Sequence, residues 1–195
     1  GDDFGYIKRG NPEKAAEMAF RDARISHVKN GVYGEMFVSA MIACAAVTDS
    51  IEDIILGGLA QIPATSRLHE AVMKIFDGYK NGVSYEDCFN SIHSEYDEHS
   101  DHGWCHTISN AMIVTAALLY GEGDFGKSIC FAVGMAFDTD CNGATVGSIL
   151  GMRNTIDGID DCWKKPVNGK IHTSIFGVDT VEIEKAVEKT IEHLD

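Results

Sequence analysis

Apolar residues recur every three to four positions along most of the chain, which is the period of an amphipathic helix. One such stripe, in residues 13–28, includes His27 and would place this histidine on the buried face. The segment 34–47, GEMFVSAMIACAAV, is apolar on almost every side, so it predicts a helix at the centre of a larger bundle. Helices are expected over residues 13–28, 34–47, 51–60, 66–79, 84–96, 107–120, 125–135, 142–155 and 180–194.

The remaining stretches are expected to be loops. Residues 1–12, GDDFGYIKRGNP, end in a proline that suits the start of a helix. The polar stretch HSEYDEHSDHG, residues 93–103, has no apolar period. No run alternates apolar and polar residues convincingly enough to predict a strand, and no internal repeat is present. The sequence therefore predicts an all-α fold, with residues 1–195 forming a single domain.

Charge and cysteine content narrow the functional classes. The chain has 16 Lys and Arg against 30 Asp and Glu, a formal charge of −14, which disfavours binding to nucleic acid or an anionic membrane. The cysteines stand singly without a CxxC pair, which is typical of reduced, buried thiols in a cytosolic protein. No signal peptide opens the chain, and no apolar run reaches the roughly 18 residues of a membrane span. A cytoplasmic protein is expected.

The stretch FDTDCNGATVGSILG, residues 137–151, contains the strongest candidate site. Carboxylates at Asp138 and Asp140 can converge on one cation if the backbone bends, and their hard oxygens suit Mg²⁺, Mn²⁺ or Ca²⁺. The alternative is that an aspartate here only caps a helix or complements its dipole.

Three glycines follow at one-turn intervals, at Gly143, Gly147 and Gly151. Each costs about 0.5 to 1 kcal/mol in a helix interior relative to alanine. They would clear one helix face, either for a ligand, as we expect at Gly143, or for close packing of another helix, which suits Gly147 and Gly151.

The stretch DTDCNGATVGSILG resembles the C-terminal metal motif of the ADP-ribosylglycohydrolase family, whose members commonly read GGDTDTxGAxxGAxxG. Three more stretches resemble successive pieces of one subgroup of that family, in the same order: AAEMAFRDARISHVKNGVYGEMFVSAMIA, GLAQIPATSRL and WCHTISNAMIVTAALLYGEGDFGKSI. The resemblance covers nearly the whole chain. It implies a compact all-α bundle that carries two adjacent divalent cations, usually Mg²⁺ and in some members Mn²⁺.

In this family the cation ligands come from a Thr-Asp-Asp motif near the N-terminus and an Asp-Thr-Asp motif near the C-terminus. The second corresponds to Asp138 and Asp140, which the resemblance makes cation ligands and catalytic residues. No Thr-Asp-Asp occurs here, and GDDFGYI resembles a mid-family stretch, so Asp2 and Asp3 are not expected to replace it. We expect the chain to be the C-terminal part of a longer fold, incomplete on its N-terminal side. Its partner would be the missing segment, a second chain or another copy of itself.

The resemblance also suggests residues that contact the substrate. His27 followed six residues later by Tyr33 reproduces a spacing that lines the ADP-ribose site in relatives, against the alternative of a core histidine. Many relatives have threonine where this chain has Cys141, and a thiol is a poor ligand for Mg²⁺, so Cys141 is left out of the ligand set.

Other polar residues allow two interpretations each. Trp104 and His106 are candidates for substrate contact, although an indole can equally cover the core. Asn110 either bonds the backbone or reaches the site. The irregular spacing of three loop histidines favours a solvated loop over a zinc site. They are His93, His99 and His102.

The function implied is hydrolysis of an N- or O-glycosidic bond at the anomeric carbon of a ribose, in an ADP-ribosylated side chain or a related ADP-ribosyl compound. The alternative is a catalytically silent, crystallin-like structural relative, although retention of both aspartates favours the enzyme. By itself the chain is expected to bind metal weakly and to have little activity.

Overall fold

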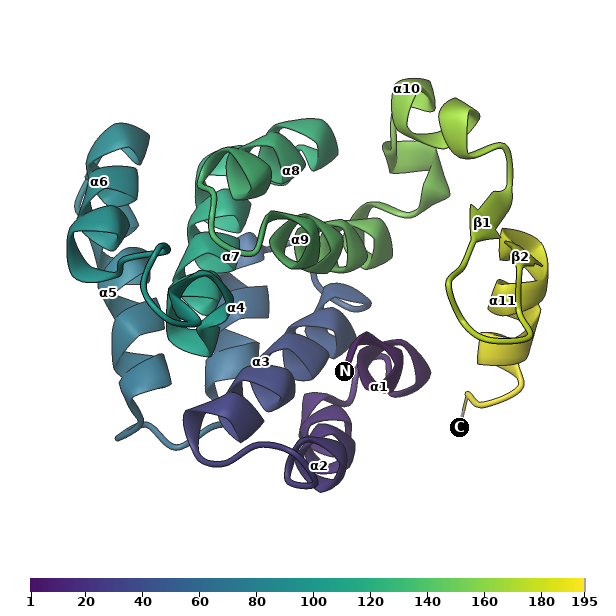
Figure 1. Ribbon diagram of the computed structural model, residues 1–195, viewed down its shortest axis with the longest axis horizontal. Helices are drawn as coiled ribbons and strands as arrows, with labels where there is room; N and C mark the ends of the chain where they lie inside the picture. The colour runs from purple at the N-terminus through teal and green to yellow at the C-terminus, as the bar shows by residue number, and fades with distance from the viewer. Residues whose placement is uncertain (195) are drawn as a thin grey trace.

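Helices follow the predicted apolar spacing through most of the computed structural model, which describes residues 1–194 (Figure 1). Across these residues the α-helices are α1 (Asp2–Ile7), α2 (Pro12–Ala23), α3 (Asn30–Ala45), α4 (Ile51–Leu59), α5 (Arg67–Lys80), α6 (Tyr85–Glu95), α7 (Thr107–Gly121), α8 (Phe125–Gly134), α9 (Thr139–Asn154), α10 (Asp161–Lys164) and α11 (Ile183–Ile191). Short 3₁₀ turns lie at η1 (Gly103–Cys105), η2 (Ile156–Gly158) and η3 (Lys165–Val167). The prediction of a helical bundle is confirmed.

Two central helices organise the core. Helix α3 is buried over most of its length, as its uniformly apolar sequence predicts, and α7 is buried even more completely. Both contact α4, α5 and α9, so their side chains form one continuous apolar cluster with those of their neighbours. Some of the buried polar groups are paired, for example the Thr115 hydroxyl, which donates to the Ala111 carbonyl at 2.8 Å, whereas the buried Ser128 hydroxyl has no hydrogen-bond partner. Such pairing avoids the cost of an unsatisfied buried polar group.

Side-chain caps fix several helix starts. The hydroxyls of Ser66 and Ser84 accept hydrogen bonds from the backbone N–H groups of His69 and Asp87, at 3.2 and 3.1 Å. Each such cap typically stabilises a helix by about 1 kcal/mol. The starts predicted at these two serines are therefore confirmed.

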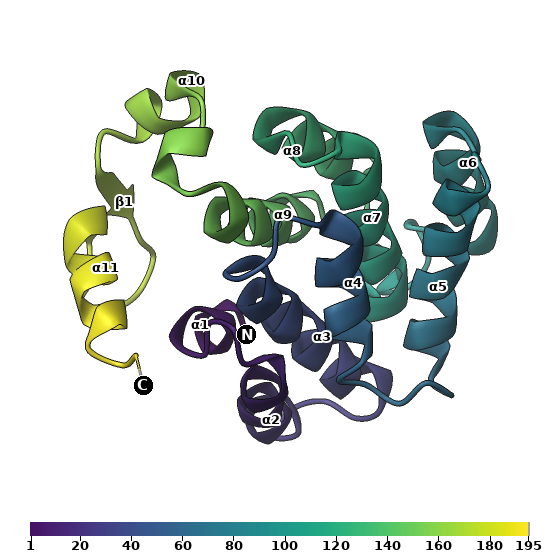
Figure 2. The same cartoon turned by 180° about the vertical axis from the view of Figure 1, so that it is seen from behind.

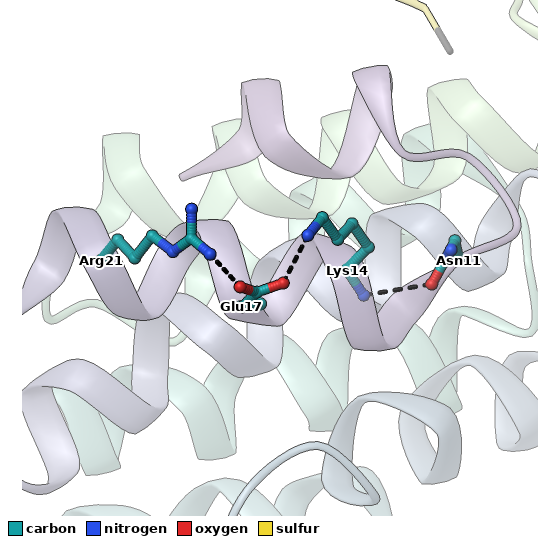
Figure 3. A network of polar contacts seen from close by, with 4 residues as sticks. All are labelled: Asn11, Lys14, Glu17 and Arg21. Carbon is teal, nitrogen blue, oxygen red and sulfur yellow. Dashed lines mark hydrogen bonds and ion pairs between the residues drawn. The ribbon is translucent and has the colours of Figure 1, made fainter.

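The exposed face of α2 carries a charge network (Figure 3). Glu17 accepts from Lys14 Nζ at 2.6 Å and pairs with Arg21 one turn later. The Lys14 hydrogen bond lowers the pKa of Glu17 below its usual value, with a further contribution from Arg21. Pairs this exposed add little stability. The helix is held instead by alanines packed against α3, at Ala15, Ala16, Ala19 and Ala23.

The N-terminal loop prediction is wrong, because residues 2–7 form α1. This short helix is stabilised by packing on α3 rather than by its own propensity. Gly5 makes the close approach possible, since a Cβ there would lie 2.5 Å from Cβ of Ile42. Such tertiary contact leaves no periodic signal in a six-residue segment.

Residues 155–194 form an arm beside the helical bundle, next to α1 in both views (Figures 1 and 2). None of these residues is buried. The arm contains an antiparallel hairpin of β1 (Lys170–His172) and β2 (Thr180–Glu182), in which Ile171 pairs with Val181. The sequence did not predict these strands, because three residues are too few for a period of two to be recognised. Their pairing also moves the start of the last helix from 180 to 183.

The thiol prediction holds only in part. Cys44 and Cys88 are buried, whereas the others are exposed, and all six are free. Within residues 1–194, no helix is both long and apolar enough to cross a membrane.

Candidate functional site

The two predicted aspartates meet at the N-terminus of α9. Asp138 occupies the N-cap position, but its carboxylate accepts no capping hydrogen bond, and Asp140 lies in the first turn. Ligand atoms of Asp138, Asp140 and Cys141 lie within 4.8 Å of one another. In the described part of the chain, no other group of three or more potential metal-ligating side chains converges in this way. His93 lies on α6 and not in the loop that was predicted to contain it. A capping hydrogen bond therefore does not account for Asp138, whereas Asp140, in the first turn, also fits the alternative of an acid that complements the helix dipole.

The electrostatics of Cys141 keep its thiol neutral. Partial burial raises the pKa of Cys141 to about 11, together with a hydrogen bond to the Asp138 carboxylate and the negative charges of Asp138, Asp140 and Asp2. A thiol protonated at neutral pH is a weak ligand, and a hard cation prefers oxygen. The two carboxylates are therefore the better candidates for a hard cation such as Mg²⁺ or Mn²⁺.

The backbone that leads into α9 is strained. Ala136 and Phe137 have φ values of 62° and 59°, in the left-handed region that glycine occupies freely. Each non-glycine residue in this region costs roughly 1–2 kcal/mol. The motif that the chain resembles has two glycines at these positions, which would adopt positive φ without this cost.

A cavity of about 330 Å³ adjoins the aspartates. Cys141 lines this cavity and is also one of the three side chains whose ligand atoms converge. The cavity walls come from the loop before α3, from α3 itself, and from the N-terminal turns of α7 and α9. Two residues predicted to contact substrate, His27 and Asn110, line this cavity. His27 is exposed, because α2 ends at Ala23 and the chain has already left the helix. The expectation of a buried stripe position is wrong for this histidine, and the core alternative is excluded.

Asn110 has both of the roles that were open for it, since it hydrogen-bonds the backbone and also reaches the candidate site. Its side-chain amide donates to the carbonyls of Trp104 and His106, at 3.0 Å each, and its oxygen accepts from Asn142 Nδ2 at 2.7 Å. It also faces the cavity. Asn110 therefore connects the start of α7 to the start of α9 at the edge of the candidate site.

The structure does not bring the other predicted contacts into this cavity. Tyr33 is partly buried against the core, and Trp104 is 50% exposed on η1. His106 caps α7, accepting from the Ile108 N–H at 3.2 Å, and lines a separate polar hollow together with Tyr96.

Two glycines of the stripe, Gly143 and Gly147, face helix α8. A Cβ at Gly143 would lie 3.2 Å from Val133 Cγ2, and one at Gly147 would lie 3.7 Å from Ile129 Cδ1. Only the distance at Gly143 is tight, whereas the one at Gly147 is an ordinary van der Waals contact and a Cβ at Gly151 would meet nothing within 4 Å. Close packing therefore explains Gly143, where a ligand was expected, and it does not explain Gly147 and Gly151, where packing was expected.

Two acidic residues that sequence analysis did not select also line the cavity. Asp2 Oδ2 accepts from Ser148 Oγ at 2.6 Å, which fixes α1 against α9. Glu35, on α3, has a side chain only 22% exposed, and its Oε1 atom is buried without a hydrogen-bond partner. Burial raises the pKa of Glu35, against the opposing charge of the N-terminal amine. The sequence did contain a signal for Glu35, because it is the only charged residue in the apolar segment 34–47.

Comparison with known proteins identifies the family of the chain. The family model described as ADP-ribosylglycohydrolase matches residues 4–193, almost the entire chain. A search of the curated proteins and a search of the solved structures returned no match. The carboxylate pair at the start of α9 thus occurs in a chain whose full length fits one family model. The chain belongs to the ADP-ribosylglycohydrolase family.

Proposed function

We propose that this chain carries part of the active site of a metal-dependent hydrolase that cleaves the glycosidic bond of an ADP-ribosylated side chain or a related ADP-ribosyl compound. One observation carries the proposal. The carboxylates of Asp138 and Asp140 converge without a capping role, beside a cavity whose volume of about 330 Å³ suits a ribose and its substituent.

Asp138 and Asp140 would hold a divalent cation, Mg²⁺ or Mn²⁺, and the complete family site would contain two. When bound, such a cation stabilises negative charge and lowers the pKa of its water. Mg²⁺ requires near-octahedral oxygen coordination, and two carboxylates supply only part of it. We propose that the other ligands come from water and from a segment outside residues 1–195, or from a second copy of the chain. By itself the chain would then bind metal weakly and turn over little substrate.

The chain's own residues divide the remaining work. His27 and Asn110 line the cavity and would contact the ribose end of the ligand. Glu35 holds its proton to a higher pH than an ordinary carboxyl group, because it is partly desolvated. It would therefore serve as a proton donor to the leaving group. Asp140, which is exposed at the first turn of α9, would also orient the attacking water.

The first test is a titration of the chain with Mn²⁺, followed by electron paramagnetic resonance of the free ion. Asp138→Asn and Asp140→Asn should each weaken binding by more than about tenfold, since each removes a charged ligand. Asp157→Asn, an exposed acid on η2, is the matched control and should bind as the wild type does. Equal affinity in all four proteins would refute the metal site.

The second test is a calorimetric titration of ADP-ribose into the chain in the presence of Mg²⁺. Binding that disappears in Asp140→Asn would support the proposed hydrolase and justify assays on ADP-ribosylated arginine and serine peptides. Binding of neither metal nor ADP-ribose, in the chain and in a longer protein containing it, would favour a catalytically silent structural relative.

A further inference from the structure

Three side chains from outside α8 and α9 hold the strained segment that joins these helices, residues 135–138. They come from α6, from the loop after it, and from the first turn of α7. They are His93, Glu98 and Asn110, and each hydrogen-bonds a different backbone group of the segment. We call this set of three side chains the clamp.

The clamp fixes the segment at consecutive points. His93 Nε2 lies 3.0 Å from the Met135 carbonyl, and because a carbonyl can only accept, this nitrogen carries the proton. Glu98 Oε2 accepts from the Phe137 N–H at 2.9 Å. Asn110 Oδ1 accepts from the Asp138 N–H at 3.3 Å. The backbone is therefore held immediately before, within and after the two residues with positive φ.

Aromatic packing adds to this restraint. The Phe137 side chain is 7% exposed, and its ring centroid lies 5.0 Å from that of His93. The ring centroid of Phe89 lies 4.4 Å from that of His93. A phenylalanine with positive φ is rare, and it persists only where its surroundings determine the conformation. Here burial of the ring and the hydrogen bonds of the clamp act together.

We propose that His93, Glu98 and Asn110 are positioning residues that hold residues 135–138 in the left-handed conformation and thereby bring the Asp138 and Asp140 carboxylates together. The consequence for metal binding rests on the function proposed above, whereas the effect on the backbone does not. Glu98 gives the cleanest test, because it contacts the segment and, unlike Asn110, does not line the cavity.

The backbone part is tested by amide hydrogen exchange of the metal-free chain, measured by NMR. Glu98→Ala should accelerate exchange at Phe137 and Asp138, while Glu98→Gln, whose amide oxygen still accepts, should retain most of the protection. Glu95→Ala, which removes a neighbouring acid that pairs with Lys74 on α5, is the matched control and should leave both amides unchanged. Unaltered exchange in Glu98→Ala would overturn the proposal.

The metal part is tested by Mn²⁺ titration of the same proteins. Glu98→Ala should bind about tenfold more weakly, within the range measured for residues that orient metal ligands, and Glu98→Gln should nearly restore the affinity. Adding Ala136→Gly to Glu98→Ala should recover part of the loss, because glycine adopts positive φ without strain. If Glu98→Gln lost as much affinity as Glu98→Ala, the carboxylate charge would be responsible and the positioning role would be wrong. If neither the wild-type chain nor a longer protein containing it bound Mn²⁺, the proposed function would be refuted, and the exchange data would still decide on the clamp.

Discussion

Residues with a strained, positive φ lie at both ends of helix α9, but the surroundings of the two ends differ. Before the helix, Ala136 and Phe137 have positive φ, and three side chains from elsewhere in the fold hold them. After it, Thr155 has φ 59° and ψ 176°, a region that suits essentially only glycine. Beyond Thr155 the chain continues into an arm without a single buried residue among 155–194. The candidate site thus lies at the end where strain is supported on all sides.

Hydrogen bonds hold the last residues of α9, whereas the arm beyond it contacts the bundle through Trp163, which packs against Phe125 of α8, and through α11, which contacts α1. Arg153 Nε donates to the Asp49 carbonyl at 2.7 Å, and Asn154 Nδ2 donates to the Gly123 carbonyl at 3.0 Å. These bonds keep α9 in place, and thereby keep its N-terminal carboxylates in place. They do not extend to the arm. Positive φ thus occurs within a hydrogen-bonded segment at one end of α9 and at the boundary between buried and exposed structure at the other.

Removal of a buried ring should give the largest effect on this comparison. Phe137→Ala should lower the free energy of unfolding by about 3 kcal/mol, because a buried aromatic side chain is lost from the core. Phe176→Ala, in the arm, removes a ring that is 102% exposed and should change stability by less than about 0.5 kcal/mol. Urea denaturation measures both. Similar losses in the two variants would mean that the arm is packed as firmly as the site.

Glycine at the arm boundary should have the next largest effect. Thr155→Gly should raise the free energy of unfolding by about 1 kcal/mol, since the relief of strain exceeds the entropy that glycine adds to the unfolded chain. Thr173→Gly, in an exposed segment of the arm, is the comparison and should not stabilise the protein. A loss of stability in Thr155→Gly would show that the threonine side chain makes a contact worth more than the strain.

A glycine introduced before α9 should also stabilise the protein, but by less than the glycine introduced after it. Ala136→Gly should raise the free energy of unfolding by about 0.5 to 1 kcal/mol, because the strain of one left-handed residue is partly offset by glycine entropy. The smaller gain would show that the clamp already carries part of the strain at this end. A gain larger than that of Thr155→Gly would reverse the comparison.

The sequence predicted the parts of the fold that depend on local periodicity. The apolar segments became the central helices α3 and α7, and the serine caps marked the starts of α5 and α6. Helix α1 and the hairpin were missed because both are too short for a period, and each depends on contacts with distant residues. Periodicity therefore describes long elements, and tertiary packing decides the short ones.

The residues of the candidate site were likewise predicted only where the sequence carries a local signal. Asp138 and Asp140 were found because two acids at close spacing in one turn are visible in the sequence. Asp2 was dismissed on its sequence context, yet α1 brings it to the cavity wall. Glu35 gave a signal that was not used. The positive φ at Phe137 had a signal only in the glycine pair of the resembled motif, whereas the side chains that hold this conformation lie about forty residues away in the chain.

Substitution of Glu35 should have the smallest effect on stability. The sign of this effect follows from the burial of Glu35 in the cavity beside the N-terminal end of α9. Burial raises its pKa in the folded state above the value in the unfolded chain. Its contribution to stability is therefore fully present below the unfolded pKa and is lost as the pH rises through the folded pKa. Glu35→Gln should raise stability at pH 7 relative to the wild type and reduce the loss on going from pH 4 to pH 7. Glu13→Gln, on the exposed face of α2, repeats the comparison outside the cavity. If unfolding curves showed an equal loss between pH 4 and pH 7 in the wild type and Glu35→Gln, Glu35 would not hold its proton in the fold, and its role as proton donor would fail with it.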